Sequence, residues 1–220
     1  MKKKIIALCL LVALVATAVV SGTLAYFTDE DENNNVFTMD GSTVDITLDE
    51  AKVNKDGDEW EATDDRVHGN TYKNVYPGAV LPKDPTVHNE GTMDAYVRAH
   101  VTINFNKLAG LTADKELFDE ENKDAELLAI LDIDTDNWTF VGYEVDSDAR
   151  TVTYTYNYNT ALAAGGSATL FTKATIPTTL TQEDKAAYGL QTLNIDITAD
   201  AIQAVTFGDV EEAFAAYDAE

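Results

Sequence analysis

The amino-acid sequence predicts a mainly β protein, a single antiparallel β-sandwich with short helical insertions. Several short segments alternate apolar and polar residues, and this period of two is typical of a strand that buries one face. Clusters of glycine, aspartate and asparagine separate these segments, as turns between strands do. No proline-rich or serine-rich linker divides the 220 residues, and an all-β chain of this length commonly forms one domain.

The clearest predicted strand covers Ala95–Phe105, where apolar residues alternate with a second set that includes Arg98 and His100. Asp146–Asp148 is typical of a hairpin turn between two further strands. Residues Asn54–Asn70 are rich in charge and are predicted to form a loop. The other predicted strands are Val44–Leu48, Trp138–Val145, Thr151–Asn159, Ala168–Ile176 and 193–204.

Helical signals occur at three places. A helix is predicted over 112–131, where Thr112 can act as its N-cap, and a short helix is predicted to begin at Thr181. Residues 210–220 are predicted to form a short acidic amphipathic helix that covers part of the chain's own sandwich, with docking on a partner as the alternative. Its apolar residues at helical spacing are Val210, Phe214 and Tyr217.

The N-terminus has the three regions of a secretory signal peptide. Lys2–Lys4 precede an apolar run over 5–20, and small residues follow. We predict that residues 1–25 are removed between Ala25 and Tyr26. An uncleaved anchor is the alternative, but the clean apolar run ends at Ser21 and a membrane span usually needs about 18 or more apolar residues. We therefore expect a secreted protein of the extracellular matrix or cell surface, with no stable membrane insertion after cleavage.

Composition limits the function classes. The formal net charge is −24, and the single cysteine, Cys9, lies in the predicted signal peptide. The mature chain would therefore form no disulfide of its own, although secretion permits them. Strong negative charge disfavours nucleic acid and anionic membranes as partners, and it permits divalent cations and basic partners.

Residues 26–39 are predicted to be an extended N-terminal segment that precedes a sandwich domain at 40–209. Most of this segment is polar and acidic, so it has little to bury by itself. Val36–Met39 is its most strand-like part, and Asp40–Gly41 supplies a turn signal.

Three groups of residues, taken with their order along the chain, resemble the TasA/camelysin family. These are secreted matrix proteins of Gram-positive bacteria that a dedicated signal peptidase processes. Residues 108–136 carry no part of the resemblance. The matching residues are Gly22–Asp29 with Asn35–Thr38 and Val44–Leu48, then Tyr76–Gly78 with Val87–Arg98, then Ala199–Ala204.

The resemblance implies a jelly-roll-like sandwich that assembles head-to-tail into extracellular fibres of a biofilm matrix. In that family the N-terminal segment of one subunit is thought to complete the sheet of its neighbour, a form of donor-strand complementation. The implied partners are other copies of the chain, other matrix or cell-surface proteins, and the signal peptidase. The alternative is that the segment is simply the first strand of its own sheet. The apolar assembly residues would be Phe27, Val36, Phe37 and Met39.

The sequence predicts a protein without catalytic residues. Some camelysin relatives are described as metallopeptidases, so a metal-dependent secreted peptidase is the main alternative. The chain has three histidines and no His-Glu-x-x-His pattern, and its serines, Ser167 among them, lie in no nucleophile-elbow motif.

A calcium- or glycan-binding surface protein is a further alternative. Asp132, Asp134 and Asp136 alternate as calcium ligands can, but Asn137 and Tyr143 stand where an EF-hand needs glycine and glutamate. Solvated acidic loops are the simpler interpretation, and no cofactor other than calcium is suggested. Three tyrosines on one face of a strand could stack on sugars, but core packing is favoured. These tyrosines are Tyr154, Tyr156 and Tyr158.

Overall fold

The computed structural model describes residues 28–30, 41–57, 59–104, 130–146, 148–149, 151–176, 178 and 194–219. These residues form antiparallel sheets and one short helix, so the predicted mainly β sandwich is confirmed. The predicted assembly residues Phe27, Val36, Phe37 and Met39 lie outside the described residues. So do the cleavage site at Ala25 and Tyr26 and most of the two internal helices predicted from the sequence.

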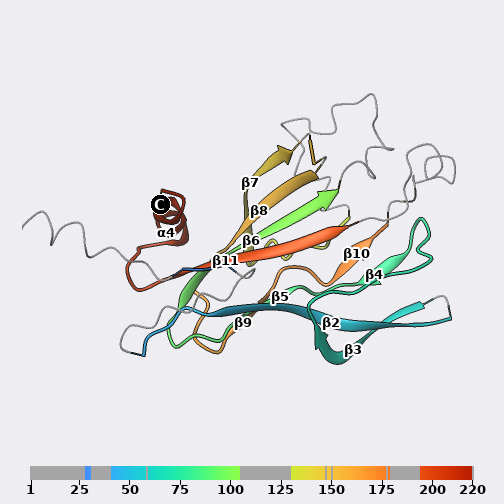
Figure 1. The fold of residues 1–220 in the computed structure, drawn as a ribbon, viewed down its shortest axis with the longest axis horizontal. Coiled ribbons are helices and arrows are strands. Elements are labelled where there is room, and N and C mark those ends of the chain that lie inside the picture. The colour runs from blue at the N-terminus through green and yellow to red at the C-terminus, as the bar shows by residue number, and fades with distance from the viewer. Residues whose placement is uncertain are drawn as a thin grey trace, which may run out of the picture.

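One layer of the sandwich is a five-stranded antiparallel sheet in the order β1-β11-β6-β8-β7 (Figure 1). The short strand β1 forms one edge and β7 forms the other. The bounds are β1 (Thr28–Glu30), β11 (Ile195–Gln203), β6 (Ala95–Asn104), β8 (Thr151–Tyr158) and β7 (Trp138–Asp146).

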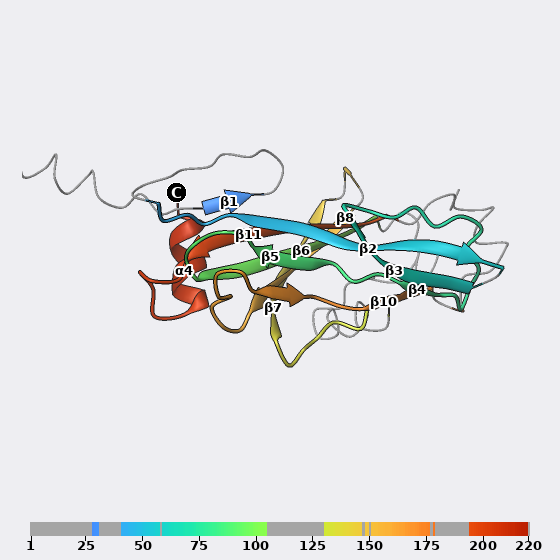
Figure 2. The same cartoon turned by 90° about the horizontal axis from the view of Figure 1, so that it is seen from below.

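The facing layer is a four-stranded sheet in the order β3-β2-β5-β9, and a two-stranded sheet of β10 and β4 extends it (Figure 2). Here β3 and β9 are the edges. The bounds are β3 (Glu59–Val67), β2 (Ile46–Asp56), β5 (Thr86–Asn89), β9 (Ser167–Thr169), β10 (Lys173–Thr175) and β4 (Val80–Pro82).

The alternation in β6 buries one face of the strand against the other sheet. Val97 and Val101 are fully buried, and Tyr154 and Tyr156 from the neighbouring strand β8 lie in the same core. Tyr158 is half-buried, with its ring edge-to-face against Trp138. The core interpretation of these tyrosines is therefore supported, because burying large aromatic rings between two sheets removes much apolar surface from water.

Two sequence predictions about the four-stranded sheet were wrong. Asn54–Asn70 is not a loop but mostly a hairpin, in which β2 continues to Asp56 and β3 returns from Glu59. Gly57 lies in the turn with φ of +60°, which glycine adopts readily. Most side chains of β3 are exposed, so the segment lacks the apolar alternation that indicates a strand.

The predicted strand Ala168–Ile176 is also two strands, β9 and β10, that belong to different sheets. Leu170 and Phe171 between them are both buried. A continuous apolar run therefore hides the point at which the chain passes from one sheet to the next.

The end of β5 is fixed by a buried asparagine and a closely packed glycine. The Asn89 side chain donates to the carbonyl oxygens of Met93 and Leu162, at 2.8 and 2.9 Å. A Cβ atom at Gly91 would lie 2.5 Å from the carbonyl oxygen of Thr43. Only glycine fits there without movement of the backbone, so the strand ends at a defined point.

The C-terminal helix α4 (Val210–Tyr217) lies where the sequence predicts it. Its N-cap, Asp209, accepts from the backbone N–H of Glu212 at 2.8 Å. Val210 and Phe214 pack with Ile202 in a small apolar cluster. The helix therefore covers part of the five-stranded sheet on the side opposite the main core (Figure 1). Among the described residues, no helix combines the length and apolar character that a membrane span requires.

Candidate functional sites

Three parts of the structure can carry function: the sheet edge that holds β1, the cluster around Arg98 beneath α4, and the outer face of the four-stranded sheet. At the first, β1 pairs antiparallel with β11, so that Thr28 lies opposite Ile202 and Glu30 opposite Asp200. An edge strand of three residues, which begins two residues after Tyr26, thus lies close to the predicted cleavage site (Figure 2). A strand this short is held by few backbone hydrogen bonds.

Arg98 joins the sheet to α4 next to this edge. Its guanidinium donates to both carboxylate oxygens of Asp218, at 2.7 and 2.9 Å, and to Asp200 at 3.3 Å. It also lies over the ring of Phe214, 4.3 Å from the centroid. Hydrogen bonds from Arg98 hold the pKa of Asp218 below its ordinary value, against the opposing effect of burial. The arginine therefore fastens the last turn of α4 to β6 and β11.

A chain of hydrogen bonds crosses the outer face of the four-stranded sheet. Arg66 Nε donates to Asp49 Oδ1 at 2.8 Å, and His88 Nε2 lies 2.9 Å from the same oxygen. His88 Nδ1 is 2.7 Å from Ser167 Oγ. These residues come from β3, β2, β5 and β9, so one polar line spans all four strands.

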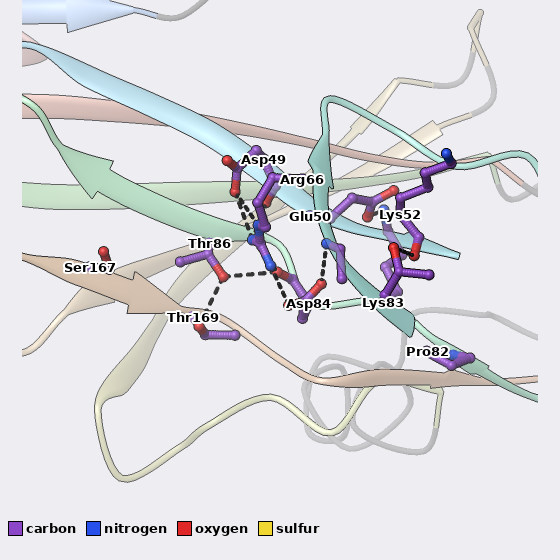
Figure 3. Close-up of polar contacts among 12 residues, drawn as sticks. Asp49, Glu50, Lys52, Arg66, Pro82, Lys83, Asp84, Thr86, Ser167 and Thr169 are labelled. Carbon is purple, nitrogen blue, oxygen red and sulfur yellow. Dashed lines mark hydrogen bonds and ion pairs between the residues drawn. The ribbon is translucent and has the colours of Figure 1, made fainter. Parts of the chain in front are cut away.

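The start of this line is held firmly. Arg66 lies between Asp49 and Asp84, with Thr86 and Thr169 beside it (Figure 3). Burial acts to raise the pKa of Asp49, but hydrogen bonds from Arg66 and His88 outweigh it, so the pKa is lowered. Asp49 is therefore ionised at neutral pH.

A second line with the same order of groups crosses the outer face of the five-stranded sheet. Arg98 donates to Asp200, His100 Nε2 lies 2.9 Å from Asp200 Oδ2, and His100 Nδ1 lies 3.1 Å from Thr155 Oγ1. Each sheet thus carries an arginine, an aspartate, a histidine and a hydroxyl in series. We call them the Ser167 line and the Thr155 line.

A buried ion pair lies next to the Ser167 line. Glu50 is almost fully buried and accepts from Lys83 Nζ at 2.5 Å and from the backbone N–H of Asn70 at 2.7 Å. The Tyr72 hydroxyl donates to the Pro82 carbonyl oxygen. Burial, aided by the charges of Glu50 and Asp84, raises the pKa of this hydroxyl. These contacts tie the loop after β3 to β2 and to β4, which gives them a structural role.

The three aspartates considered as candidate calcium ligands are placed differently from one another. Asp132 accepts from the backbone N–H groups of Thr172 and Lys173, at 2.9 and 2.7 Å, and Asp134 accepts from the Asn137 side chain at 2.8 Å. Asp136 is exposed. Within the part of the chain that the structure describes, no three histidine, cysteine, aspartate or glutamate side chains are grouped to hold a metal ion.

The third histidine, His68, has its Nδ1 3.2 Å from the carbonyl oxygen of Leu48 and joins neither line. Sequence reasoning missed the Ser167 line because its members are far apart in the chain. A signal was present in principle, because Asp49 directly follows the predicted strand Val44–Leu48. The pairing of β5 with β9, which brings His88 to Ser167, could not be derived from that pattern.

Together, the sandwich, the short edge strand and the C-terminal helix define a β-sandwich protein whose N-terminal segment closes a sheet edge. A family model described as camelysin metallo-endopeptidase matches residues 1–116, which is more than half of the chain. The chain therefore belongs to the camelysin family, and the resemblance read from the sequence is confirmed. No curated protein and no solved structure matches the chain. The family match includes Asp49 and His88 but ends before Ser167.

Proposed function

We propose that this protein is a secreted structural subunit that assembles head-to-tail into extracellular biofilm matrix fibres by exchange of its N-terminal strand. The observation that carries the proposal is the antiparallel pairing of β1 with β11 at a sheet edge. A neighbouring copy can supply the same three residues to the same edge, with the same backbone hydrogen bonds. Such a contact uses different surfaces on its two sides, so it does not close on itself and generates a filament.

The short pairing of β1 supports exchange between copies. Because the segment has few hydrogen bonds to lose, leaving its own sheet costs little, and the same bonds return in the neighbour. The intrachain arrangement is favoured at low concentration because the segment is tethered beside its edge. Higher concentration favours the exchanged form. Phe27, Val36, Phe37 and Met39 are the candidates for additional apolar contacts in the exchanged arrangement.

Predicted cleavage after Ala25 would control assembly. An uncleaved segment is tethered by its apolar run, whereas a cleaved one begins two residues before β1 and can reach a neighbour. The acidic composition suits a protein that remains soluble until it assembles. Other matrix or cell-surface proteins are candidate partners, and none of the described contacts requires a cofactor.

A disulfide test distinguishes exchange from other modes of assembly. A chain that starts at Tyr26 contains no cysteine, so Asp29→Cys in one preparation and Ala201→Cys in another place single thiols on residues that are paired in the register. Oxidised mixed filaments are expected to contain disulfide-linked pairs of chains. The double variant is expected to form an intrachain disulfide at low concentration and to assemble poorly.

Electron microscopy of two chains, one starting at Tyr26 and one at Asp40, tests whether the segment is needed. Filaments only from the longer chain support the proposal. Filaments without interchain disulfides contradict strand exchange, and folded monomers under all conditions contradict the structural role.

The family description provides a second candidate function, a metal-dependent peptidase. The supporting result is proteolysis that persists through purification and is abolished by a chelator. The same monomeric preparation serves for this assay and for thermal denaturation with low-millimolar calcium, which tests cation binding at Asp132, Asp134 and Asp136.

A further inference from the structure

We propose that Ser167 is a nucleophile that accepts an acyl group from a small carboxylic ester, with His88 as its general base. This inference is independent of fibre assembly. It rests on the Ser167 line, in which a hydroxyl, an imidazole and a carboxylate are joined in series at 2.7 and 2.9 Å. A nucleophile within hydrogen-bond reach of a base that a third group orients is the general arrangement for nucleophilic catalysis.

The hydrogen-bond partners determine which nitrogen of His88 carries the proton. Asp49 is ionised and can only accept, so the contact at Nε2 requires His88 to donate from that nitrogen. The neutral ring then has its lone pair on Nδ1. In this neutral form the Ser167 hydroxyl donates to Nδ1, the nitrogen that would remove its proton.

Asp49 is itself held in place, which keeps the ring in one orientation. Arg66 donates to the Asp49 carboxylate through Nε and to its backbone carbonyl oxygen through a terminal nitrogen, at 2.8 and 3.1 Å. Because the positive charge of Arg66 already compensates the negative charge of Asp49, the carboxylate mainly positions the His88 ring. Proton transfer is then the work of the Ser167–His88 pair.

Ser167 is open to a substrate from solvent. It is exposed at the first position of β9, which is an edge strand. Gly165 and Gly166 precede it, and a Cβ atom built at Gly165 would meet nothing within 4 Å. The neighbouring hydroxyls on this face belong to Thr86 and Thr169, which lie 2.9 Å from each other.

The backbone of Ser167 also offers a donor for a developing negative charge. Asn89 N–H donates to the Gly166 carbonyl oxygen at 2.9 Å, so the next pair, His88 and Ser167, is a non-hydrogen-bonded pair of the antiparallel ladder. The N–H of Ser167 therefore points away from β5. Among the described residues it has no recorded hydrogen-bond partner, so it can stabilise the oxygen of a tetrahedral intermediate.

The chemistry balances with an ester and water as the reactants. Ser167 Oγ attacks the carbonyl carbon while its proton passes to His88 Nδ1. The bond from the carbonyl carbon to the leaving oxygen then breaks, and the leaving alcohol takes the proton from Nδ1. Water, deprotonated by the same nitrogen, attacks the acyl-serine, and Ser167 leaves with the proton. A single oxyanion donor on an open sheet face suits small esters with good leaving groups.

The test is covalent labelling of the purified full chain by a fluorophosphonate, followed by mass spectrometry of the labelled peptide. The expected result is one adduct, on Ser167, and release of p-nitrophenol from p-nitrophenyl acetate that Ser167→Ala abolishes. His88→Gln should slow labelling about 100-fold, the typical contribution of a general base. Circular dichroism of each variant checks that the fold is retained, and His88→Asn replaces His88→Gln if the glutamine variant unfolds.

Ser42 is the internal control, because it is a half-buried serine and no histidine contact is recorded for it among the described residues. The absence of an adduct on Ser167 in the native chain overturns the proposal, whatever the variants do. Equal labelling rates for Ser42 and Ser167, or an unchanged rate in folded His88→Gln, also overturn it. In those cases the Ser167 line is only a structural ladder.

Discussion

The Ser167 line and the Thr155 line contain the same groups in the same order, but they differ in what covers them. In the Thr155 line the arginine side chain is only 10% exposed and a helix packs on it through Phe214 and Asp218. In the Ser167 line the arginine side chain is 32% exposed and the hydroxyl stands at an open edge. The comparison teaches that burial, more than the hydrogen-bond pattern, decides the role. The covered line holds the helix α4 on its sheet, whereas the open line leaves the Ser167 hydroxyl exposed to solvent.

The largest expected effect comes from removing the covered arginine. Arg98→Leu removes the guanidinium beside buried Asp200, which keeps only its contact with His100, and releases Asp218, so the free energy of unfolding should fall by about 3 kcal/mol. Urea denaturation followed by circular dichroism measures this. An effect below about 1 kcal/mol would contradict the assigned role of Arg98 in fastening α4.

An intermediate effect is expected at the glycine that fixes the end of β5. Gly91→Ala places a Cβ atom against the Thr43 carbonyl oxygen, so the backbone after the end of β5 must shift, at a cost of about 2 kcal/mol. Thermal denaturation measures the loss. Gly69→Ala is the matched control, since a Cβ atom there meets nothing within 4 Å, and equal losses in the two variants would rule out this explanation.

Acid should weaken the contact between α4 and Arg98, because it protonates Asp218. The folded-state pKa of Asp218 lies below its ordinary value of 3.8, so its contribution is present above that value and is lost as the pH falls through the folded pKa. Asp218→Asn should therefore flatten the fall in stability between about pH 4 and pH 2. Denaturation midpoints across this range test the sign. A steeper fall in the variant would contradict it.

The smallest expected effect comes from the open arginine. Arg66→Leu removes partly exposed ion pairs with Asp49 and Asp84, which typically contribute less than about 1 kcal/mol. The same urea denaturation measures the loss of stability in Arg66→Leu, which is then compared with the loss in Arg98→Leu. Equal losses at the two arginines would remove the distinction between a covered and an open line.

Much of the fold follows from local patterns in the sequence. The alternation in β6, β7 and β8 predicts strands whose observed ends differ by one residue at most from the expected ones. The spacing of Val210 and Phe214 predicts α4, and burial of both residues follows from their shared helical face. These elements are predictable because each buries one face, so that apolar residues recur at the period of the strand or helix.

Other elements lack that periodic pattern of apolar residues. The strand β3 is exposed along most of its length, so charge conceals it within an apparent loop. The run from Ala168 to Ile176 is buried on both sides of a change of sheet, so its apolar residues give no sign of the break. The pairing of Thr28–Glu30 with β11 joins the two ends of the chain, and no local pattern encodes such a partner.

The sequence by itself determined the β class, the family, the acidic charge and the residues that form most strands, because these depend on composition and on neighbours along the chain. Only the tertiary structure decided which strands adjoin. That choice places β1 on β11, Arg98 beneath α4 and His88 against Ser167. The physical reason is that strand order and register are set by how the whole core packs, and hydrogen bonds between distant residues form only after those choices are made.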